Sequence, residues 1–225
     1  MITKYEKYTD LQALQNKEEN DRVAAEYLGT FVGGLLCFEG YWDFNVYGRR
    51  SCKPFVENLP ALTGEFIRCG YRNFETKDQL KYYLKWPEGL VWQNPQTWGT
   101  SVFYVSCHGS NKGFDLPMGL ITKDDLIDIF NEGFSNFPNV LYFSACSLFE
   151  DDAFGHKLLE VSGSRGIFGF KKEVGYTMGL LIDLVFLATF YMFKDDDPFQ
   201  YLQQIYDSVI DTIPIAKDFG FTLFV

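Results

Sequence analysis

The sequence predicts an α/β fold, a three-layer sandwich with a mostly parallel central sheet. Short apolar runs with the length of buried strands alternate along the chain with amphipathic helical patterns, as in parallel sheets covered on both faces. The chain has 225 residues, enough for one domain with a substantial core but cramped for two. Its composition, 47% hydrophobic and 22% charged, argues against disordered, collagen-like and coiled-coil architectures.

The beginning of the chain differs from the rest. The first 28 residues are charged and polar, with apolar residues at roughly helical spacing, so we expect residues 1–32 to form a peripheral helix or arm. From Gly33 the sequence becomes apolar, and residues 33–225 are expected to form a single α/β domain. Five runs are expected to be buried strands: residues 33–38, 65–69, 102–107, 140–145 and 166–170.

Helical patterns lie between these strands. Residues 76–84 open with a threonine, Thr76, that can cap a helix, and a second capped helix begins at Thr122. Asp124 and Asp125 follow it in the first turn, where acidic residues favour the helix dipole. Further helices are expected over residues 51–62, 152–161, 175–193 and 198–210.

One apolar run, residues 174–193, is long enough to raise the question of a membrane. It contains Asp183 and is followed by Lys194 and three aspartates, which favours a helix of the protein core over a membrane span. No basic segment followed by an apolar one stands at Met1, so a secretory signal is not expected and the cytoplasm is the default location.

Charge and cysteine content narrow the function further. The formal net charge of −10 argues against a nucleic acid partner bound through its phosphates. Five cysteines without a C-x-x-C pair fit reduced thiols, and with only two histidines we expect no metal site. The sequence lacks the G-x-S-x-G, Walker A, strand-linked G-x-G-x-x-G and H-E-x-x-H motifs. Chemistry without a cofactor, or no chemistry, is therefore expected.

The ends of two predicted strands carry candidate catalytic residues. The third strand runs into His108 and Gly109, and the fourth runs into Cys146. If the two strands are parallel neighbours, the thiol and the imidazole project from the same edge of the sheet, as a cysteine nucleophile and its base require. The amides of Gly109 and Cys146 would then be candidates for an oxyanion hole.

A structural interpretation of the same residues remains open. The thiols of Cys107 and Cys146 can be ordinary buried groups, and His108 can simply end a turn. Cys107 is the weaker nucleophile candidate because it lies within the predicted strand. His156, in a predicted helix after an acidic loop, is expected to be solvated.

These strand ends resemble a known family. An apolar strand ending in His-Gly, followed after 35 to 40 residues by one ending in Ala-Cys, is similar to the caspase-like cysteine peptidases, especially their bacterial CHAT-type branch. The resemblance covers about residues 33–195. A subgroup of small bacterial proteins also shares the stretches CFEGYW at residues 37–42 and LKYYLKW at residues 80–86. The resemblance implies a caspase-haemoglobinase fold and peptide-bond hydrolysis through an acyl-enzyme, with Cys146 as nucleophile and His108 as general base or acid.

The resemblance also implies a role and partners. Similar proteins perform limited proteolysis in bacterial stress or antiviral responses, so a protein or peptide substrate and an activating or scaffold protein are expected. One departure favours a second hypothesis: residues 147–150, Ser-Leu-Phe-Glu, replace the Thr-Gly or Ser-Gly that usually follows the cysteine, and a bulky loop here would close the cleft. The alternative is thus a latent or catalytically silent domain that binds a partner, or a second copy of itself, through aromatic side chains.

Substrate preference follows from the same resemblance. The loop leaving the first strand helps to build the pocket for the residue before the scissile bond, which makes Glu39 a candidate acidic group, with Asp115 as a second. Either carboxylate would favour a basic substrate residue. Glu39 can instead be solvated or cap a helix, and the pair Arg49 and Arg50 can equally hold an acidic substrate residue. The preference stays open, with a lean toward basic residues.

Overall fold

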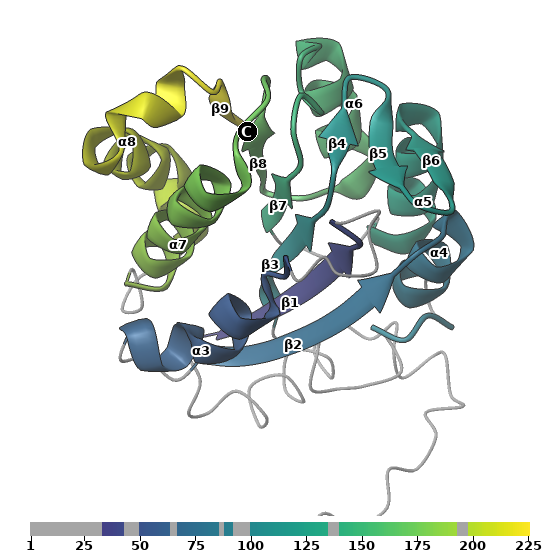
Figure 1. Ribbon diagram of the computed structural model, residues 1–225, viewed down its shortest axis with the longest axis horizontal. Coiled ribbons are helices and arrows are strands. Elements are labelled where there is room, and N and C mark those ends of the chain that lie inside the picture. Colours follow the sequence, from purple (N-terminus) through teal and green to yellow (C-terminus); the bar gives the residue numbers. More distant parts are fainter. Residues whose placement is uncertain are drawn as a thin grey trace, which may run out of the picture.

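The computed structural model describes residues 33–42, 50–63, 67–85, 88–91, 100–134, 140–192 and 198–225 (Figure 1). The helix or arm predicted for residues 1–32 and the side chain of Arg49 lie outside these ranges.

A six-stranded, mostly parallel sheet forms the centre of the molecule. Its strand order is β2-β1-β3-β7-β8-β9. The strands are β1 (Gly33–Gly40), β2 (Ile67–Phe74), β3 (Thr100–Ser106), β7 (Val140–Ser144), β8 (Gly166–Phe170) and β9 (Phe221–Phe224). The first five are parallel to their neighbours, and β9 pairs with β8 in the antiparallel direction.

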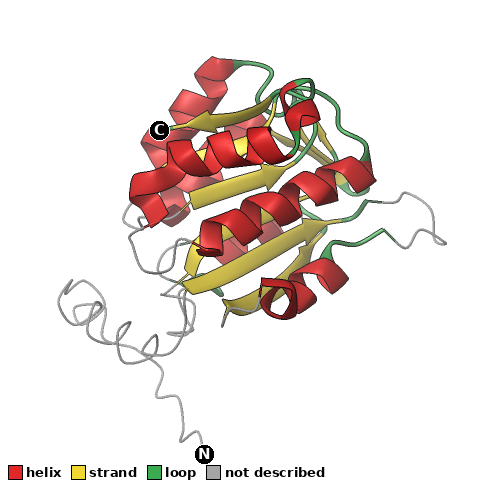
Figure 2. Ribbon diagram, turned by 90° about the vertical axis from the view of Figure 1, so that its left-hand side faces the viewer, coloured by secondary structure: helices red, strands yellow, loops and turns green. Residues whose placement is uncertain are grey.

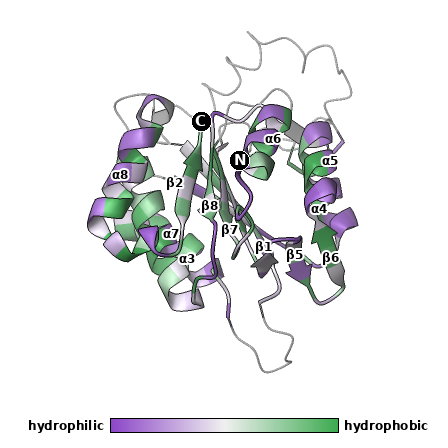
Figure 3. Cartoon of the chain, turned by 90° about the horizontal axis from the view of Figure 1, so that it is seen from above, coloured by the Kyte–Doolittle hydropathy of each residue, from purple (hydrophilic) through white to green (hydrophobic). Residues whose placement is uncertain are grey.

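Helices flank both faces of this sheet (Figures 1 and 3). On one face lie α3 (Lys53–Thr63), α7 (Tyr176–Met192) and α8 (Leu202–Thr212), and on the other lie α4 (Lys77–Leu84), α5 (Lys123–Phe134) and α6 (Asp152–Ser162). Figure 2 shows the helices in red running alongside the yellow strands. Two short 3-10 helices, η2 (Pro198–Tyr201) and η3 (Pro214–Lys217), flank α8.

A small antiparallel sheet begins directly after His108. Its strands are β4 (Gly109–Ser110), β5 (Gly113–Leu116) and β6 (Gly119–Thr122). The amide of Asp115 donates to the carbonyl of His108 at 3.0 Å, which ties this sheet to the end of β3. The sequence did not predict it, because runs of two to four residues are too short to show a strand periodicity.

Apolar side chains form one cluster on each face of the central sheet, and aromatic rings make up much of both. The ring of Tyr142, for example, lies 4.5 Å from that of Phe186, which lies 4.5 Å from that of Phe168. The aromatic content of the chain therefore serves the core to a large extent. Within the described residues, no helix is both long enough and apolar enough to cross a membrane.

The predicted helices and strands are found as helices and strands in the structure, and most of their bounds agree. The second strand is displaced, from the predicted residues 65–69 to Ile67–Phe74, and β9 was not predicted at all. Thr76 caps α4 as expected, since its hydroxyl accepts from the amide of Gln79 at 3.2 Å. The α/β class with a mostly parallel central sheet is confirmed.

Candidate active site

The two candidate catalytic residues extend neighbouring strands by the same length. Strands β3 and β7 are parallel, with Ser106 opposite Ser144, so His108 and Cys146 each lie two residues beyond the last pair. The amide of Cys107 still donates to the carbonyl of Ser144, at 3.3 Å. The sheet thus places both residues side by side at its carboxyl edge, as the sequence predicted.

The strand order reverses next to this position, between β1 and β3. From β1 the chain first moves outward to β2 and then returns to the other side of β1 with β3. In open α/β sheets, ligands bind beyond the carboxyl ends of the strands at such a reversal. The ends of β1 and β3 therefore form a favoured place for a binding site.

Gly109 lies against the backbone of the residues before and at the candidate nucleophile. A Cβ atom built on Gly109 would come within 2.6 Å of the Cys146 carbonyl oxygen and 2.8 Å of the Ala145 Cβ. No side chain fits there, which explains the glycine. The two residues predicted to supply oxyanion-hole amides are consequently in direct contact.

The imidazole of His108 is held by Trp42, which follows β1. Its Nε2 makes a short hydrogen bond with the Trp42 carbonyl oxygen, and the two rings meet edge to face with centroids 5.3 Å apart. A carbonyl can only accept, so Nε2 carries the proton and a neutral ring has its lone pair on Nδ1. Trp42 thereby fixes both the orientation and the tautomer of a base. No local pattern in the sequence indicated that Trp42 would hold His108.

The thiol of Cys146 is half-buried and bonded to the backbone. Its Sγ accepts from the Val174 amide and donates to the Val174 carbonyl, both at 3.4 Å. Burial raises the pKa of this thiol, and the negative charge of Glu173 acts in the same direction, while the bond with Val174 opposes them. At neutral pH the group is a thiol, so nucleophilic chemistry here requires a base.

A small recess opens beside this thiol. Its lining residues come from the end of β1, the end of β7 and the start of α7: Trp42, Ser144, Cys146, Val174, Tyr176, Gly179 and Leu180. The rings of Trp42 and Tyr176 form two of its walls, with centroids 5.3 Å apart. The guanidinium of Arg50 lies over the ring of Tyr176, 5.8 Å from its centroid.

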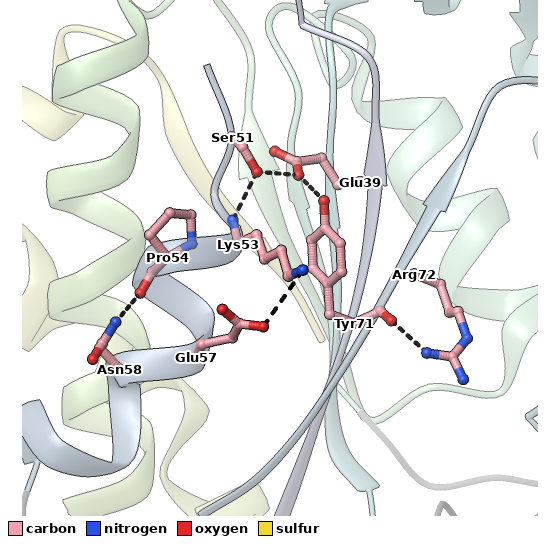
Figure 4. Close-up of polar contacts among 8 residues, drawn as sticks. All are labelled: Glu39, Ser51, Lys53, Pro54, Glu57, Asn58, Tyr71 and Arg72. Carbon is pink, nitrogen blue, oxygen red and sulfur yellow. Dashed lines mark hydrogen bonds and ion pairs between the residues drawn. The ribbon is translucent and has the colours of Figure 1, made fainter. Parts of the chain in front are cut away.

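Glu39 does not present its carboxylate to this recess. The residue is 2% exposed. Its Oε1 accepts from the Trp42 indole at 2.9 Å and from the Cys52 amide at 2.6 Å. Its Oε2 accepts from the Ser51 hydroxyl at 2.7 Å and from the Tyr71 hydroxyl (Figure 4). Four donors use the acceptor capacity of a carboxylate. Glu39 instead holds the indole of Trp42, and the indole in turn packs against the imidazole of His108.

Other candidates lie in different surroundings. Asp115 is part of β5, half-buried, next to the end of β3. Burial strongly raises the pKa of Cys107, which lies in the core and is unsuited to act as a nucleophile. His156 is exposed on α6, as predicted, with its ring 5.2 Å from that of Phe224.

Two of the residues after Cys146 lie in the core and do not line the recess. Leu148 and Phe149 are fully buried in the core cluster that contains Phe143 and Phe154. Ser147 adopts a left-handed backbone conformation with φ of 53°, which turns the chain toward that core. The expectation of a bulky covering loop is therefore wrong at these two side chains.

A buried carboxylate lies behind the strand ends. Asp183 on α7 accepts from the hydroxyls of Tyr104 at 2.6 Å, Ser144 at 2.8 Å and Tyr142. Tyr104 is four residues before His108, and Tyr142 and Ser144 are four and two residues before Cys146. Asp183 thus joins the two strands that lead to His108 and Cys146. Its signal in the sequence was an acidic residue inside a strongly apolar run.

Comparison with known proteins gives no assignment. Neither models of known protein families nor curated proteins match this sequence. In the part of the chain that the structure describes, no three histidine, cysteine or acidic side chains gather in a way that could hold a metal ion. The geometry at the strand ends is therefore the basis for a functional conclusion.

Proposed function

We propose that this protein is a cysteine endopeptidase of the caspase-like class, with Cys146 as nucleophile and His108 as its base. One observation carries the proposal: two parallel neighbouring strands end in register at an imidazole and a thiol, and the imidazole is held by a backbone carbonyl. The α/β fold with a mostly parallel sheet is compatible with the caspase-haemoglobinase arrangement.

In the proposed reaction each of these groups has a defined role. With Nε2–H donating to the Trp42 carbonyl, Nδ1 of His108 takes the proton of the Cys146 thiol. The thiolate attacks the peptide carbonyl carbon, and the resulting oxyanion accepts hydrogen bonds from the amides of Gly109 and Cys146. His108 then returns its proton to the leaving amine. Water attacks the thioester with His108 as base and releases the acid and the thiol.

The proposed biological setting is limited proteolysis of a protein substrate. A small effector of a bacterial stress or antiviral response fits the resemblance of the strand ends to CHAT-type peptidases. An activating or scaffold protein is part of this proposal.

One observation favours a second candidate, a latent or silent domain that binds a protein partner. The Cys146 thiol is bonded to both backbone groups of Val174, and burial raises its pKa. Burial keeps the sulfur protonated, and the two bonds to Val174 keep it occupied. In a latent enzyme, an activator would have to separate Cys146 from Val174 before the thiol could react.

The test is mass-spectrometric profiling of a diverse peptide mixture with the purified protein and three variants. We expect the wild type to cleave, and Cys146→Ala and His108→Ala to lose several orders of magnitude in rate. Cys69→Ala is a matched control, because Cys69 is another half-buried thiol but lies on β2. It is expected to cleave like the wild type.

The outcomes separate the two candidates. Cleavage that persists in Cys146→Ala contradicts the proposed nucleophile. If the wild type cleaves nothing, alkylation of Cys146 by iodoacetamide that is slow alone and accelerates with an added partner identifies the latent form. A silent module binds its partner equally well with and without the Cys146 thiol.

A further inference from the structure

We propose that the recess beside Cys146 receives the side chain preceding the scissile bond, and that Gly179 keeps it open for a small, uncharged side chain. This proposal rests on the proposed peptidase function and specifies its substrate class. It replaces the preference for basic residues that Glu39 suggested.

The position of the recess determines which substrate residue enters it. Cys146 and Ser144 form one side of the recess, and Trp42, which holds His108, forms another. A thiolate attacks the carbonyl carbon of the residue before the scissile bond. The side chain of that same residue projects from the adjacent Cα and is the one nearest the thiol.

The walls provide no partner for a charge. Three polar groups on them are already bonded within the chain: the Ser144 hydroxyl donates to Asp183, the Trp42 indole donates to Glu39, and the Cys146 thiol bonds to Val174. Of the nearby carboxylates, Glu39 and Asp183 are enclosed, with 2% and 0% exposed, while Glu173 is exposed and does not line the recess. Arg50 and Glu173 are near but are not among the lining residues, none of which is charged. A lysine, arginine, aspartate or glutamate side chain would therefore lose its hydration here without a counter-ion on the walls.

The recess is also small. It holds about one water-sized group, which suits the methyl of alanine or the hydroxymethyl of serine, and glycine leaves it empty. The rings of Trp42 and Tyr176 fix two walls, and Leu180 narrows it further. Large apolar side chains do not fit between them.

Gly179 is the residue that leaves this space open. It lies inside α7, where glycine is less favourable than alanine. Nothing in the local structure requires a glycine: an added Cβ would meet only two Val174 methyls, at the ordinary contact distances of 3.7 and 3.9 Å. Glycine at position 179 makes the helix less stable, and the local packing does not need it. We therefore attribute this glycine to the space that it leaves next to the thiol.

The experiment compares cleavage preferences of the wild type, Gly179→Ala and Gly179→Leu in the same peptide mixture. We expect wild-type cuts after glycine, alanine and serine. In Gly179→Ala, cleavage after alanine relative to glycine falls about tenfold, the effect of one methylene in a tight pocket, and Gly179→Leu cuts after glycine alone. Gly175→Ala is the matched control, since a Cβ at Gly175 meets open space and this residue is not part of the recess.

A second readout makes failure of this proposal distinguishable from failure of the peptidase function. Peptidyl acyloxymethyl ketones that differ only in the residue at the reactive end label a peptidase thiol, and intact mass reports the labelling of Cys146. Cys146-dependent cleavage or labelling that favours charged or large residues, or that Gly179→Ala leaves unchanged, overturns the recess proposal alone. Neither cleavage nor labelling with any probe overturns the peptidase function and this proposal together. Thermal unfolding confirms that Gly179→Ala is folded, with an unchanged or higher midpoint.

Discussion

Asp183 carries its carboxylate into the protein core, where three hydroxyls donate to it. Burial raises its pKa to about 6, while the hydrogen bonds from Tyr104, Tyr142 and Ser144 act in the opposite direction. Burial also strongly raises the pKa values of both tyrosines, so they remain donors throughout the neutral range. The charge state of Asp183 therefore controls how firmly β3 and β7 are joined to α7.

The substitution Asp183→Asn tests this coupling through stability. The folded chain holds the Asp183 proton more tightly than the unfolded chain, whose aspartate pKa is about 3.9. Its contribution is thus fully present below pH 4 and is lost as the pH rises through about 6. That loss is about 3 kcal/mol, from a difference of about two pKa units.

Asparagine does not titrate, so the free energy of unfolding of Asp183→Asn should rise relative to that of the wild type by about 2 kcal/mol between pH 4 and pH 7. Urea denaturation at intervals across this range measures the difference. Asp207→Asn, at an exposed position on α8, is the control and should leave the difference constant. A constant difference for Asp183→Asn would show that the carboxylate does not titrate in this range.

The sequence predicted the positions of some single residues in the candidate site and not the surroundings of others. His108 and Cys146 could be predicted because each follows directly on an apolar run that forms a strand. The surroundings of Glu39 could not, because its donors Ser51, Cys52 and Tyr71 lie 12, 13 and 32 residues away along the chain. Contacts at such separations are set by the packing of whole elements, which a local pattern does not contain.

Among the helices that the structure describes, α5 has the most complete N-terminal cap. The Thr122 hydroxyl accepts from the Asp125 amide at 3.1 Å, and the Asp125 carboxylate accepts from the Thr122 amide at 2.9 Å. This reciprocal pair is a capping box, and it satisfies two amides that the helix itself cannot. Thr122 is also the last residue of β6, so the cap sets the angle between strand and helix.

We predict that Thr122→Ala lowers the free energy of unfolding by about 1 kcal/mol. Thr122→Ser keeps the hydroxyl and should lose much less. Urea denaturation followed by circular dichroism at neutral pH gives both values. Equal losses in the two variants would assign the effect to the threonine methyl rather than to the cap.

The cap at α5 was visible in the sequence because capping residues lie within four positions of one another. The small sheet β4-β5-β6 was not, although it begins at Gly109 in the candidate site. Its strands are held by pairing with each other and by the bond between Asp115 and His108, not by a pattern of their own.

The fold class of the molecule was predicted from the alternation of apolar runs with helical patterns alone. The edge strand β9 was not predicted. This strand runs antiparallel to β8 and follows the short helix η3. It therefore does not fit the pattern of a long helix followed by a parallel strand on which the prediction relied. Its Phe224 reaches across the sheet edge to the ring of Phe149, with centroids 5.2 Å apart, and its ring occupies the space over Gly155. Phe149 lies in the turn that directly follows Cys146, so the end of the sheet supports the candidate site.

We expect Phe224→Ala to lower the free energy of unfolding by about 3 to 5 kcal/mol, because it leaves a cavity beneath α6 that the surroundings fill only in part. Val225→Ala, next in the chain but 68% exposed, is the matched control with little expected effect. Urea denaturation of the three proteins measures the losses. If Phe224→Ala is no less stable than Val225→Ala, β9 does not contribute to the cooperative core.

The hydroxyls that meet Asp183 have a consequence for how this protein can change over evolutionary time. A carboxylate at position 183 is tolerable only with donors at positions 104, 142 and 144, and those buried hydroxyls in turn need an acceptor. Replacing Asp183 takes the acceptor from the buried Tyr142 and Ser144 hydroxyls, and replacing a donor removes one of the bonds that stabilise the carboxylate. In relatives of this chain, the four positions should therefore be inherited as a unit, either all polar or all apolar, and mixed combinations should be rare.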